Sequence, residues 1–335
     1  MTFWNSPSKL EDRQPAKISP AFTDKPFGEM ETTIITNEIS LALILRAHAL
    51  WLRGESEEGR CILDGATLNG LNLSRADLQR AVIRGTTLLD AELSEAKLSE
   101  AIIDAVDFQR ALLGGANFSE ARIAESNFES SWMSDVTLAD AEVRNAGFRK
   151  AHLRGARFQG TLLESCKFPA AILSGACFNH SRVNLCDFSE SDLSAVQFVR
   201  ARVAGSRFYA AKGQDLNFSH CLLKNCDFAR ADLGRARFSH ADLTGSQFDR
   251  AQLQDADLRS AQLGGVIFSR ADLSGARFAG ATLLAADLRG ADLGNAREMS
   301  SQQLAQARTD ENTILPNGSR GPYRRHSGAE RAGNR

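Results

Sequence analysis

The sequence predicts an all-β solenoid, and two observations on its apolar residues carry that prediction. Every fifth residue from Leu63 to Leu293 is apolar apart from Gly213, over 47 positions. Two places before nearly every central residue stands a small residue, which is Ala in 28 of the 47 units and otherwise mostly Ser, Cys, Thr or Val. A period of five matches neither a helix nor a strand. So short a unit cannot bury its own apolar side chain, so successive units must stack on one another.

The repeating unit resembles that of the pentapeptide-repeat superfamily. The runs Ala231-Asp-Leu-Gly-Arg-Ala-Arg-Phe-Ser-His-Ala-Asp-Leu and Ala271-Asp-Leu-Ser-Gly-Ala-Arg-Phe carry the resemblance, which covers residues 61–297. It implies a right-handed quadrilateral parallel β-helix with four pentapeptides per coil. The central residue and the small residue point inward, and the other three face solvent. At ~4.8 Å per coil, about 12 coils would make a rod of about 55 Å.

A second period, of ten residues, describes the expected core. From residue 108 to residue 278 every tenth position is Phe except Leu138 and Leu258, and the centres between them are mostly Leu, Val or Ile. In a four-sided coil this spacing places Phe on two opposite walls. Phe residues 20 apart then lie on the same wall of successive coils, where their rings stack. The core residues that we expect to show this alternation are Phe188, Phe208, Phe228, Phe248, Leu193 and Leu233.

The residues before the array predict a capping helix within 31–60. Thr36 or Asn37 can serve as N-cap, and Gly54 is suited to the position after the helix. Ile39, Leu43, Ile44, Ala47, Leu50 and Trp51 form an apolar stripe at helical spacing. An open solenoid end exposes unpaired backbone and an apolar lumen, so we expect this stripe to cover the first coil. The run from His48 to Leu52 also resembles the H-x-x-W-L element that precedes bacterial pentapeptide arrays.

The other end resembles the closing element of such arrays, a short helix and an extended Asn-x-x-Leu-Pro piece, over residues 298–316. Residues 1–30 and 317–335 lack an apolar pattern, and we expect disorder there. No Sec-type signal peptide or membrane-spanning segment is evident, which favours a cytoplasmic location. Gly213 either opens a groove beside Tyr209 and Asp215 or is absorbed as a local bulge, and the bulge is favoured.

Charge is polarised along the array, although the chain as a whole has a formal net charge of −1. Residues 61–140 are net −7, whereas residues 141–240 are net +7. Superposing one expected coil on the next stacks Arg230, Arg250 and Arg270 on one corner, where like charges repel unless an acidic partner or counter-ion is present. The alternative is that acidic side chains of the chain itself neutralise the arginines, with no partner involved. The nearby acids are Asp227, Asp232, Asp242 and Asp249. The acidic candidates for partner binding are Asp90, Glu92, Glu95, Glu100, Asp104 and Asp107.

Neither cysteine nor histidine residues indicate a special site. Cys61, Cys166, Cys186, Cys221 and Cys226 occupy the small inward position, which indicates packing residues with free thiols, and only Cys177 faces outward. His180, Arg200, His220 and His240 form a second corner column. The two adjacent histidines lack a third metal ligand, so we expect no metal.

No catalytic motif or phosphate-binding loop is present, and we expect neither an enzyme nor a cofactor or small-molecule substrate. The favoured interpretation is a scaffold or adaptor that binds another protein, and the resemblance of its capped ends extends this to a bacterial secretion or effector system. The alternative is a DNA mimic that binds DNA gyrase or topoisomerase IV, as one branch of the superfamily does. Mimicry requires a mostly negative rod, and the middle of this array is positive. Direct nucleic-acid binding is disfavoured by the near-neutral pI and the aromatic-poor exterior. The oligomeric state is left open.

Overall fold

The computed structural model describes residues 38–332, which belong to one compact unit, Ile34–Arg335. The disorder predicted for residues 1–30 and the predicted N-caps Thr36 and Asn37 lie outside the described residues.

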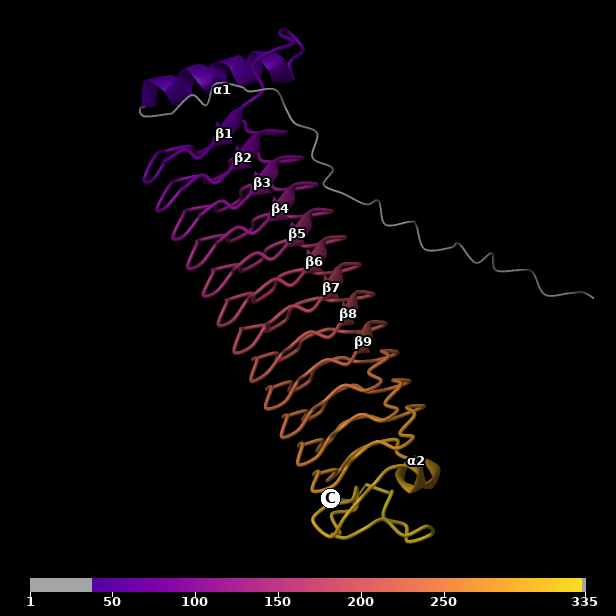
Figure 1. Ribbon diagram of the computed structural model, residues 1–335. Coiled ribbons are helices and arrows are strands. Elements are labelled where there is room, and N and C mark those ends of the chain that lie inside the picture. The colour runs from indigo at the N-terminus through magenta and orange to yellow at the C-terminus, as the bar shows by residue number, and fades with distance from the viewer. Residues whose placement is uncertain (1–37, 333–335) are drawn as a thin grey trace, which may run out of the picture. The chain divides into compact units, whose positions relative to one another are not determined.

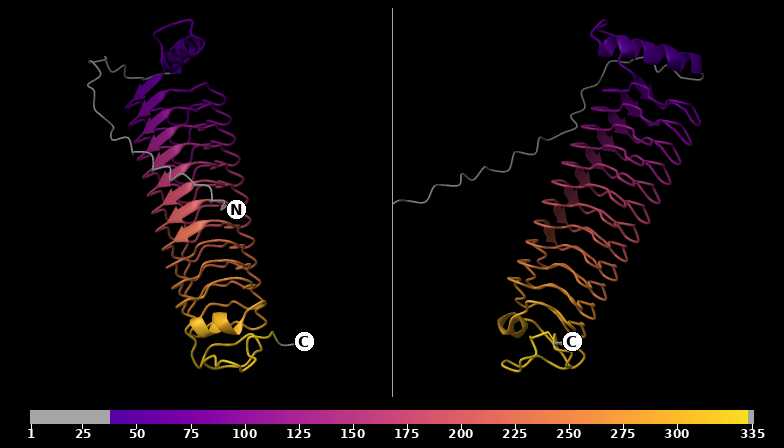
Figure 2. Two further views of the ribbon diagram at one scale, coloured as in Figure 1. Left: turned by 90° about the vertical axis from the view of Figure 1, so that its right-hand side faces the viewer. Right: turned by 180° about the vertical axis from the view of Figure 1, so that it is seen from behind.

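The described chain is a parallel β-solenoid, as the five-residue period predicts (Figures 1 and 2). Nine short strands form one sheet in sequence order, and each pairs in parallel with the next strand along the chain, so that Leu63 lies beside Ile83. The strands are β1 (Ile62–Asp64), β2 (Val82–Arg84), β3 (Ile102–Asp104), β4 (Arg122–Ala124), β5 (Glu142–Arg144), β6 (Leu162–Glu164), β7 (Arg182–Asn184), β8 (Arg202–Ala204) and β9 (Leu222–Lys224).

Each coil has four faces of one pentapeptide each. Face 1 carries the strands and has its centres at Leu63, Ile83 and every twentieth position onward. Faces 2, 3 and 4 follow in turn, with their first centres at Leu68, Leu73 and Leu78. Isolated bridges on these faces keep the same register from coil to coil. The central and small residues are buried except Leu71 and Ala76 near the first coil, which are partly buried, so the expected inward pattern is confirmed.

The strand-bearing part is shorter than the about 12 coils expected. Nine strands span eight turns, and beyond Lys224 face 1 continues only as isolated bridges such as Leu222↔Asp242 and Asp242↔Gln262. The centres of β2 to β8 are mostly Ile or Val, whereas the later centres Leu243, Leu263 and Leu283 are Leu. β-branched residues favour extended backbone, and their absence accompanies the end of the strands, although β1, β6 and β9 also have Leu centres.

The lumen is filled by two columns of phenylalanine rings, as the ten-residue period predicts. Phe188 and Phe208, in successive coils of face 2, stack with their centroids 5.0 Å apart and their planes 4° apart. Phe188 also meets Phe198 of face 4 edge-on across the lumen, at 6.2 Å and 90°. All the expected core residues, Phe188, Phe208, Phe228, Phe248, Leu193 and Leu233, are fully buried. Parallel stacking along the axis and edge-to-face contact across it are both favourable arrangements of rings.

Face 1 differs from the others at its corner. The small residues that open faces 1, 3 and 4 donate their N–H to the carbonyl of the preceding centre, as Ala231 does to Phe228 at 3.1 Å, whereas those that follow the strands of face 1 do not. At the face 1 corners of Val106, Cys186 and Cys226, a serine hydroxyl of the next coil accepts the N–H instead. These serines are Ser126, Ser206 and Ser246, and all are buried. The buried serines therefore satisfy backbone donors that the extended strand corner leaves free.

The helix α1 (Glu38–Leu52) covers the first coil, but through a different stripe from the one expected. Leu41 and His48 are buried and Ile44 and Leu45 pack against the core, whereas Leu43 is 63% exposed. The expected stripe missed His48 because a histidine was not counted as a core residue. Its Nδ1 accepts a 2.9 Å hydrogen bond from the N–H of Cys61, the first residue of the first coil.

Gly54 follows the end of the helix, as the sequence predicts. Gly54 has φ +72°, its N–H donates to Trp51, and the N–H of Glu55 donates to Leu50. These two bonds are those of a Schellman motif, in which glycine avoids the cost of left-handed backbone.

The C-terminal cap is larger than expected. The helix α2 (Ser301–Gln306) begins with a capping box of Ser300 and Gln303. The chain from 317 onward was expected to be disordered, yet it is described to residue 332 and folds over the last coil. Asn317 N–H donates to Ala329, which is 3% exposed, and Tyr323 N–H donates to Thr309 Oγ1. Tyr323 and Ala329 supply the apolar contacts that the Gly- and Arg-rich composition concealed.

Gly213 forms neither a bulge nor a groove, so the favoured bulge is wrong. Lys212 bridges Asp192 and Asp232 in the ordinary register. A Cβ on Gly213 would lie 2.9 Å from a methyl of Leu216 and 2.9 Å from one of Leu233. Leu216 is fully buried and stands where other units have a small residue. The large and small inward residues have therefore exchanged positions, and the lumen stays full.

This exchange predicts a compensating pair of substitutions. Leu216→Ala should cost about 2–5 kcal/mol by opening a cavity, and Gly213→Leu about 1–3 kcal/mol by overpacking. The double variant restores the ordinary unit and should recover most of both losses in urea unfolding. Strictly additive losses would contradict the exchange.

Burial lowers the pKa of His48 from its ordinary 6.5. The unfolded chain then takes up this proton more readily than the folded chain. The stability due to the neutral imidazole should therefore be complete above about pH 6.5 and decline as the pH falls below that value. Hydrogen exchange of α1 and Cys61 should accelerate over this range. His48→Gln, whose amide oxygen can still accept the Cys61 N–H, should lack the pH dependence; if it keeps the dependence, another group is responsible.

Candidate partner-binding surfaces

Buried apolar side chains fill the interior of the described solenoid, so the outward residues are the first candidates for function. One continuous apolar cluster extends from Leu41 of α1 to Leu304 of α2. Around it, the fifth residue of nearly every pentapeptide is a corner with positive φ, and its side chain points outward. Outward residues at the same place in successive coils therefore form columns along the solenoid.

The predicted arginine column lies at the corner between faces 2 and 3. Arg230, Arg250 and Arg270 have φ of 59°, 56° and 57° and occupy the same place in three successive coils. Their surroundings differ. The Arg230 guanidinium lies 5.9 Å from the centre of the Tyr209 ring, and Arg250 is 3.7 Å from Asp249. Arg270 has no ion pair among the described residues.

The acids proposed to neutralise this column do so only in part. Asp227 pairs with Arg207 at 3.5 Å and Asp242 with Lys224 at 3.4 Å. Asp232 accepts from the amide of Gln214 at 3.2 Å. Two of the three arginines thus keep a charge unpaired by carboxylates of the described chain, which fits a column open to an external anion or acidic group.

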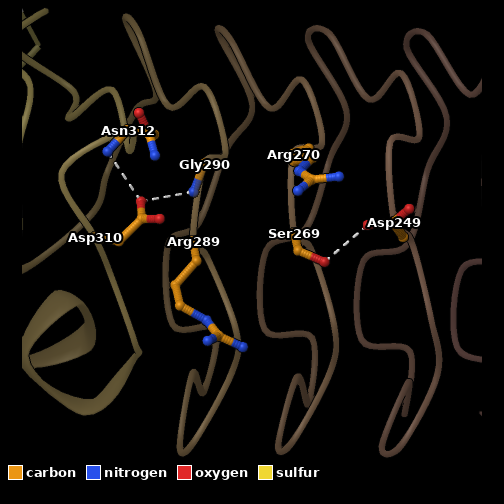
Figure 3. Close-up of a pocket in the computed structure, with 7 residues that line it drawn as sticks. All are labelled: Asp249, Ser269, Arg270, Arg289, Gly290, Asp310 and Asn312. Atoms are coloured by element: carbon orange, nitrogen blue, oxygen red, sulfur yellow. Dashed lines mark hydrogen bonds between the residues drawn. The ribbon is translucent and has the colours of Figure 1, made fainter.

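A polar pocket of about 490 Å³ lies where the column meets the C-terminal cap (Figure 3). Its lining residues are Asp249, Ser269, Arg270, Arg289, Gly290, Asp310 and Asn312. The Asp310 carboxylate accepts a 2.8 Å hydrogen bond from the N–H of Gly290. At other corners this N–H donates to a backbone carbonyl of the next coil, so Asp310 replaces that carbonyl at the end of the array. Arg289 is held by Asp287 at 2.6 Å. The polar groups are mostly satisfied by one another, so we interpret the pocket as the seam of the cap.

The six acidic candidates do not form one surface. Asp90, Glu92 and Glu95 border face 3, whereas Glu100 lies at the next corner and Asp104 and Asp107 lie on faces 1 and 2. Three of them pair with arginines one coil away: Asp90 with Arg110 at 2.7 Å, Glu95 with Arg75 at 3.0 Å and Glu100 with Arg80 at 3.0 Å. The hydrogen bond from Arg110 lowers the pKa of Asp90.

Sequence reasoning missed an apolar column on face 3. Leu112, Trp132, His152 and Ile172 are bridged in register in four successive coils. Trp132 is 53% exposed and Leu112 is 42% exposed, and the Trp132 ring stacks on His152 with 4.0 Å between centroids. Superposing the outward positions coil by coil would have revealed this column, because each member alone looks like an ordinary surface residue.

The two corner histidines stack on each other, with ring centroids of His220 and His240 4.7 Å apart. Residues 38–332 contain no group of three His, Cys, Asp or Glu side chains placed to hold a metal ion. The stacked pair is therefore part of the corner column.

Two family models of pentapeptide repeats match the chain. The model of pentapeptide repeats (8 copies) matches residues 61–99, 101–140 and 133–168, and that of the pentapeptide repeat region matches residues 161–238 and 214–288. The chain belongs to the pentapeptide-repeat family.

Solved pentapeptide-repeat structures are similar to this chain. HetL, involved in heterocyst differentiation regulation, from the cyanobacterium Nostoc sp. strain PCC 7120, is 25% identical, with 83% of this chain and 97% of HetL covered and a TM-score of 0.36. QnrB1, a plasmid-mediated fluoroquinolone resistance protein, is 18% identical, with coverages of 75% and 94% and a TM-score of 0.23. A thylakoid-lumen protein of Arabidopsis thaliana is 25% identical, with coverages of 29% and 68% and a TM-score of 0.23.

No curated protein sequence shows a significant match to this pentapeptide-repeat chain. Within the part of the chain that the structure describes, no helix has the length and apolarity needed to cross a membrane.

The six cysteines of the pentapeptide array are unbonded, as expected. Five are buried in the small inward position, and burial raises the pKa of Cys61, Cys221 and Cys226 to about 12. Cys177 is only partly buried. Because the thiolate is the reactive form, burial and a raised pKa both protect the inward cysteines.

Alkylation of the folded protein near pH 8 should therefore modify Cys177 and leave the inward cysteines unmodified, as read by peptide mass spectrometry. Unfolding in urea should expose all six. Rapid modification of Cys221 or Cys226 in the folded state would contradict this packing.

Proposed function

We propose that this pentapeptide-repeat chain is a non-catalytic scaffold or adaptor whose outer surface binds another protein. The observation that carries the proposal is the filled and closed interior. Core side chains occupy the lumen from end to end, and α1 and the C-terminal cap cover its two openings. Catalysis and small-molecule binding usually require a concave pocket that excludes water, so recognition by the outer columns is favoured.

The arginine column is the first candidate surface. Three guanidinium groups stand in one line, and the charges of Arg230 and Arg270 are unpaired by carboxylates among the described residues. An acidic protein surface would relieve their mutual repulsion and form charge-assisted hydrogen bonds. A role within a bacterial secretion or effector system is a finer proposal, and the identity of the captured protein tests it.

Replacing Arg230, Arg250 and Arg270 together with Glu should abolish capture of the partner from a native lysate. The melting temperature should move by only a few degrees, because exposed substitutions rarely change stability much. A triple variant with Arg182, Arg202 and Arg122 of face 1 changed to Glu is the matched control. Unchanged capture by the first variant would rule out the column as the docking surface.

The alternative is mimicry of duplex DNA toward gyrase or topoisomerase IV. Duplex DNA carries a charge every ~1.7 Å of axis, so a mimic needs a long, unneutralised acidic surface. Here Asp90, Glu95 and Glu100 are each paired with an arginine, which weighs against mimicry. Its test is direct: the purified protein would have to inhibit gyrase supercoiling or protect the enzyme from a quinolone.

A further inference from the structure

We propose that face 3 is a self-association surface on which two copies of the chain pack antiparallel, centred between Leu112 and Trp132. This inference goes beyond the proposed function, since it concerns a second copy and not a foreign partner. The starting observation is the apolar column of Leu112, Trp132, His152 and Ile172, in which Trp132 and Leu112 lie in neighbouring coils and are both substantially exposed.

The central contact follows from a two-fold axis that lies between the two faces and is perpendicular to the solenoid axis. Such an axis reverses the order of coils but keeps positions across the face, so each residue meets one from the same position in another coil. Leu112 then faces Trp132 of the second copy, and the reverse contact repeats it. Trp132 is suited to this role, because aromatic residues at the centre of an interface contribute most of the binding energy.

Room for the indole ring exists beside Leu112. Gly114 and Gly115 follow it on the same face and present no side chain. The nearest atoms to a Cβ built on them are 4.0 Å and 3.6 Å away and belong to Ser134 and Glu95 of the same chain. Gly114 and Gly115 therefore add no side chain that would obstruct the ring of the second copy.

The charges on either side agree with the same arrangement. One coil outward from the centre, the row bearing Glu92 faces the row bearing His152. Position by position, Asp90 faces Lys150, Glu92 faces His152, and Glu95 lies next to Arg154 of the second copy. Lys150 and Arg154 are exposed and have no ion pair within the described chain, so their charges are available.

No like charges meet in this register. Arg110 faces Ser130, Asp135 faces Gly115, and Arg75 faces Gly175. Asp90 and Glu95 already pair with Arg110 and Arg75, but exposed pairs of this kind contribute little and can be shared.

The facing strip comprises six coils, about 25 Å at ~4.8 Å per coil. A strip of this length on one face buries less area than a standard interface, which buries about 800 Å² per partner. We therefore expect a weak dimer with a dissociation constant of about 10–100 µM.

Sedimentation of the full chain from about 1 µM to about 1 mM tests the proposal. We expect a reversible monomer–dimer equilibrium. Trp132→Ser should weaken the dimer at least tenfold, whereas Leu185→Ser, at a 65% exposed leucine on the corner after face 1, should leave it unchanged. A monomer at every concentration would overturn the proposal, as would a dimer that tolerates Trp132→Ser. Pull-down of a foreign partner tests the proposed function separately.

A charge exchange tests the register. Lys150→Glu should weaken the dimer by placing like charges opposite each other, and Asp90→Lys combined with Lys150→Glu should restore it to within a few-fold. Arg200→Glu, at the corner after face 4, is the control and should have no effect. A dimer lost in both charge variants would overturn the register, provided that their melting temperatures show that they are folded.

Discussion

The structure depends on one constraint: every coil must fill a lumen of the same cross-section. Backbone hydrogen bonds join each coil to the next along the whole array, as from Phe188 N–H to Arg207 and from Arg207 N–H to Cys186, so one coil cannot widen without breaking bonds to its neighbours. Inward side chains must therefore sum to a constant volume. The alternation of Phe and aliphatic centres meets this requirement, and the exchange of Gly213 with Leu216 meets it by another route.

The same constraint separates stability from recognition. The inward residues and the corners define the coil, and the outward positions are free to vary within the limit of solubility. Non-glycine corners such as Arg230, with φ 59°, carry the cost of left-handed backbone. Each such corner also donates its N–H to the next coil, as Arg230 does to Asp249 at 2.9 Å, which helps to offset that cost. Outward residues thus form straight columns, and a column is the natural unit of surface on such a protein.

Much of the fold could be predicted because its determinants are local and repeated. The five-residue period predicted the solenoid, the ten-residue period predicted the two Phe walls, and Gly54 predicted the end of α1. What failed depends on contacts between distant or irregular segments. His48 is a core residue only because the first coil needs an acceptor for Cys61, and Tyr323 is ordered only through its contacts with the cap. Leu216 deviates from its own unit, but its side chain fills the inward space that the nearby Gly213 leaves empty.

The candidate surfaces were predicted less completely, for a related reason. The arginine column was found because identical residues recur once per coil, whereas the face 3 column mixes Leu, Trp, His and Ile and shows no sequence repeat. Net charge over a stretch of sequence was also a poor guide, because each coil distributes its residues over four faces. Asp90 and Asp104 are closer in the sequence than Asp90 and Arg110, yet the first two lie on different sides of the coil and the second two form an ion pair. On a solenoid, the relevant neighbour of a surface residue is therefore the one a full coil away, and charge has to be summed by column before a partner can be inferred from it.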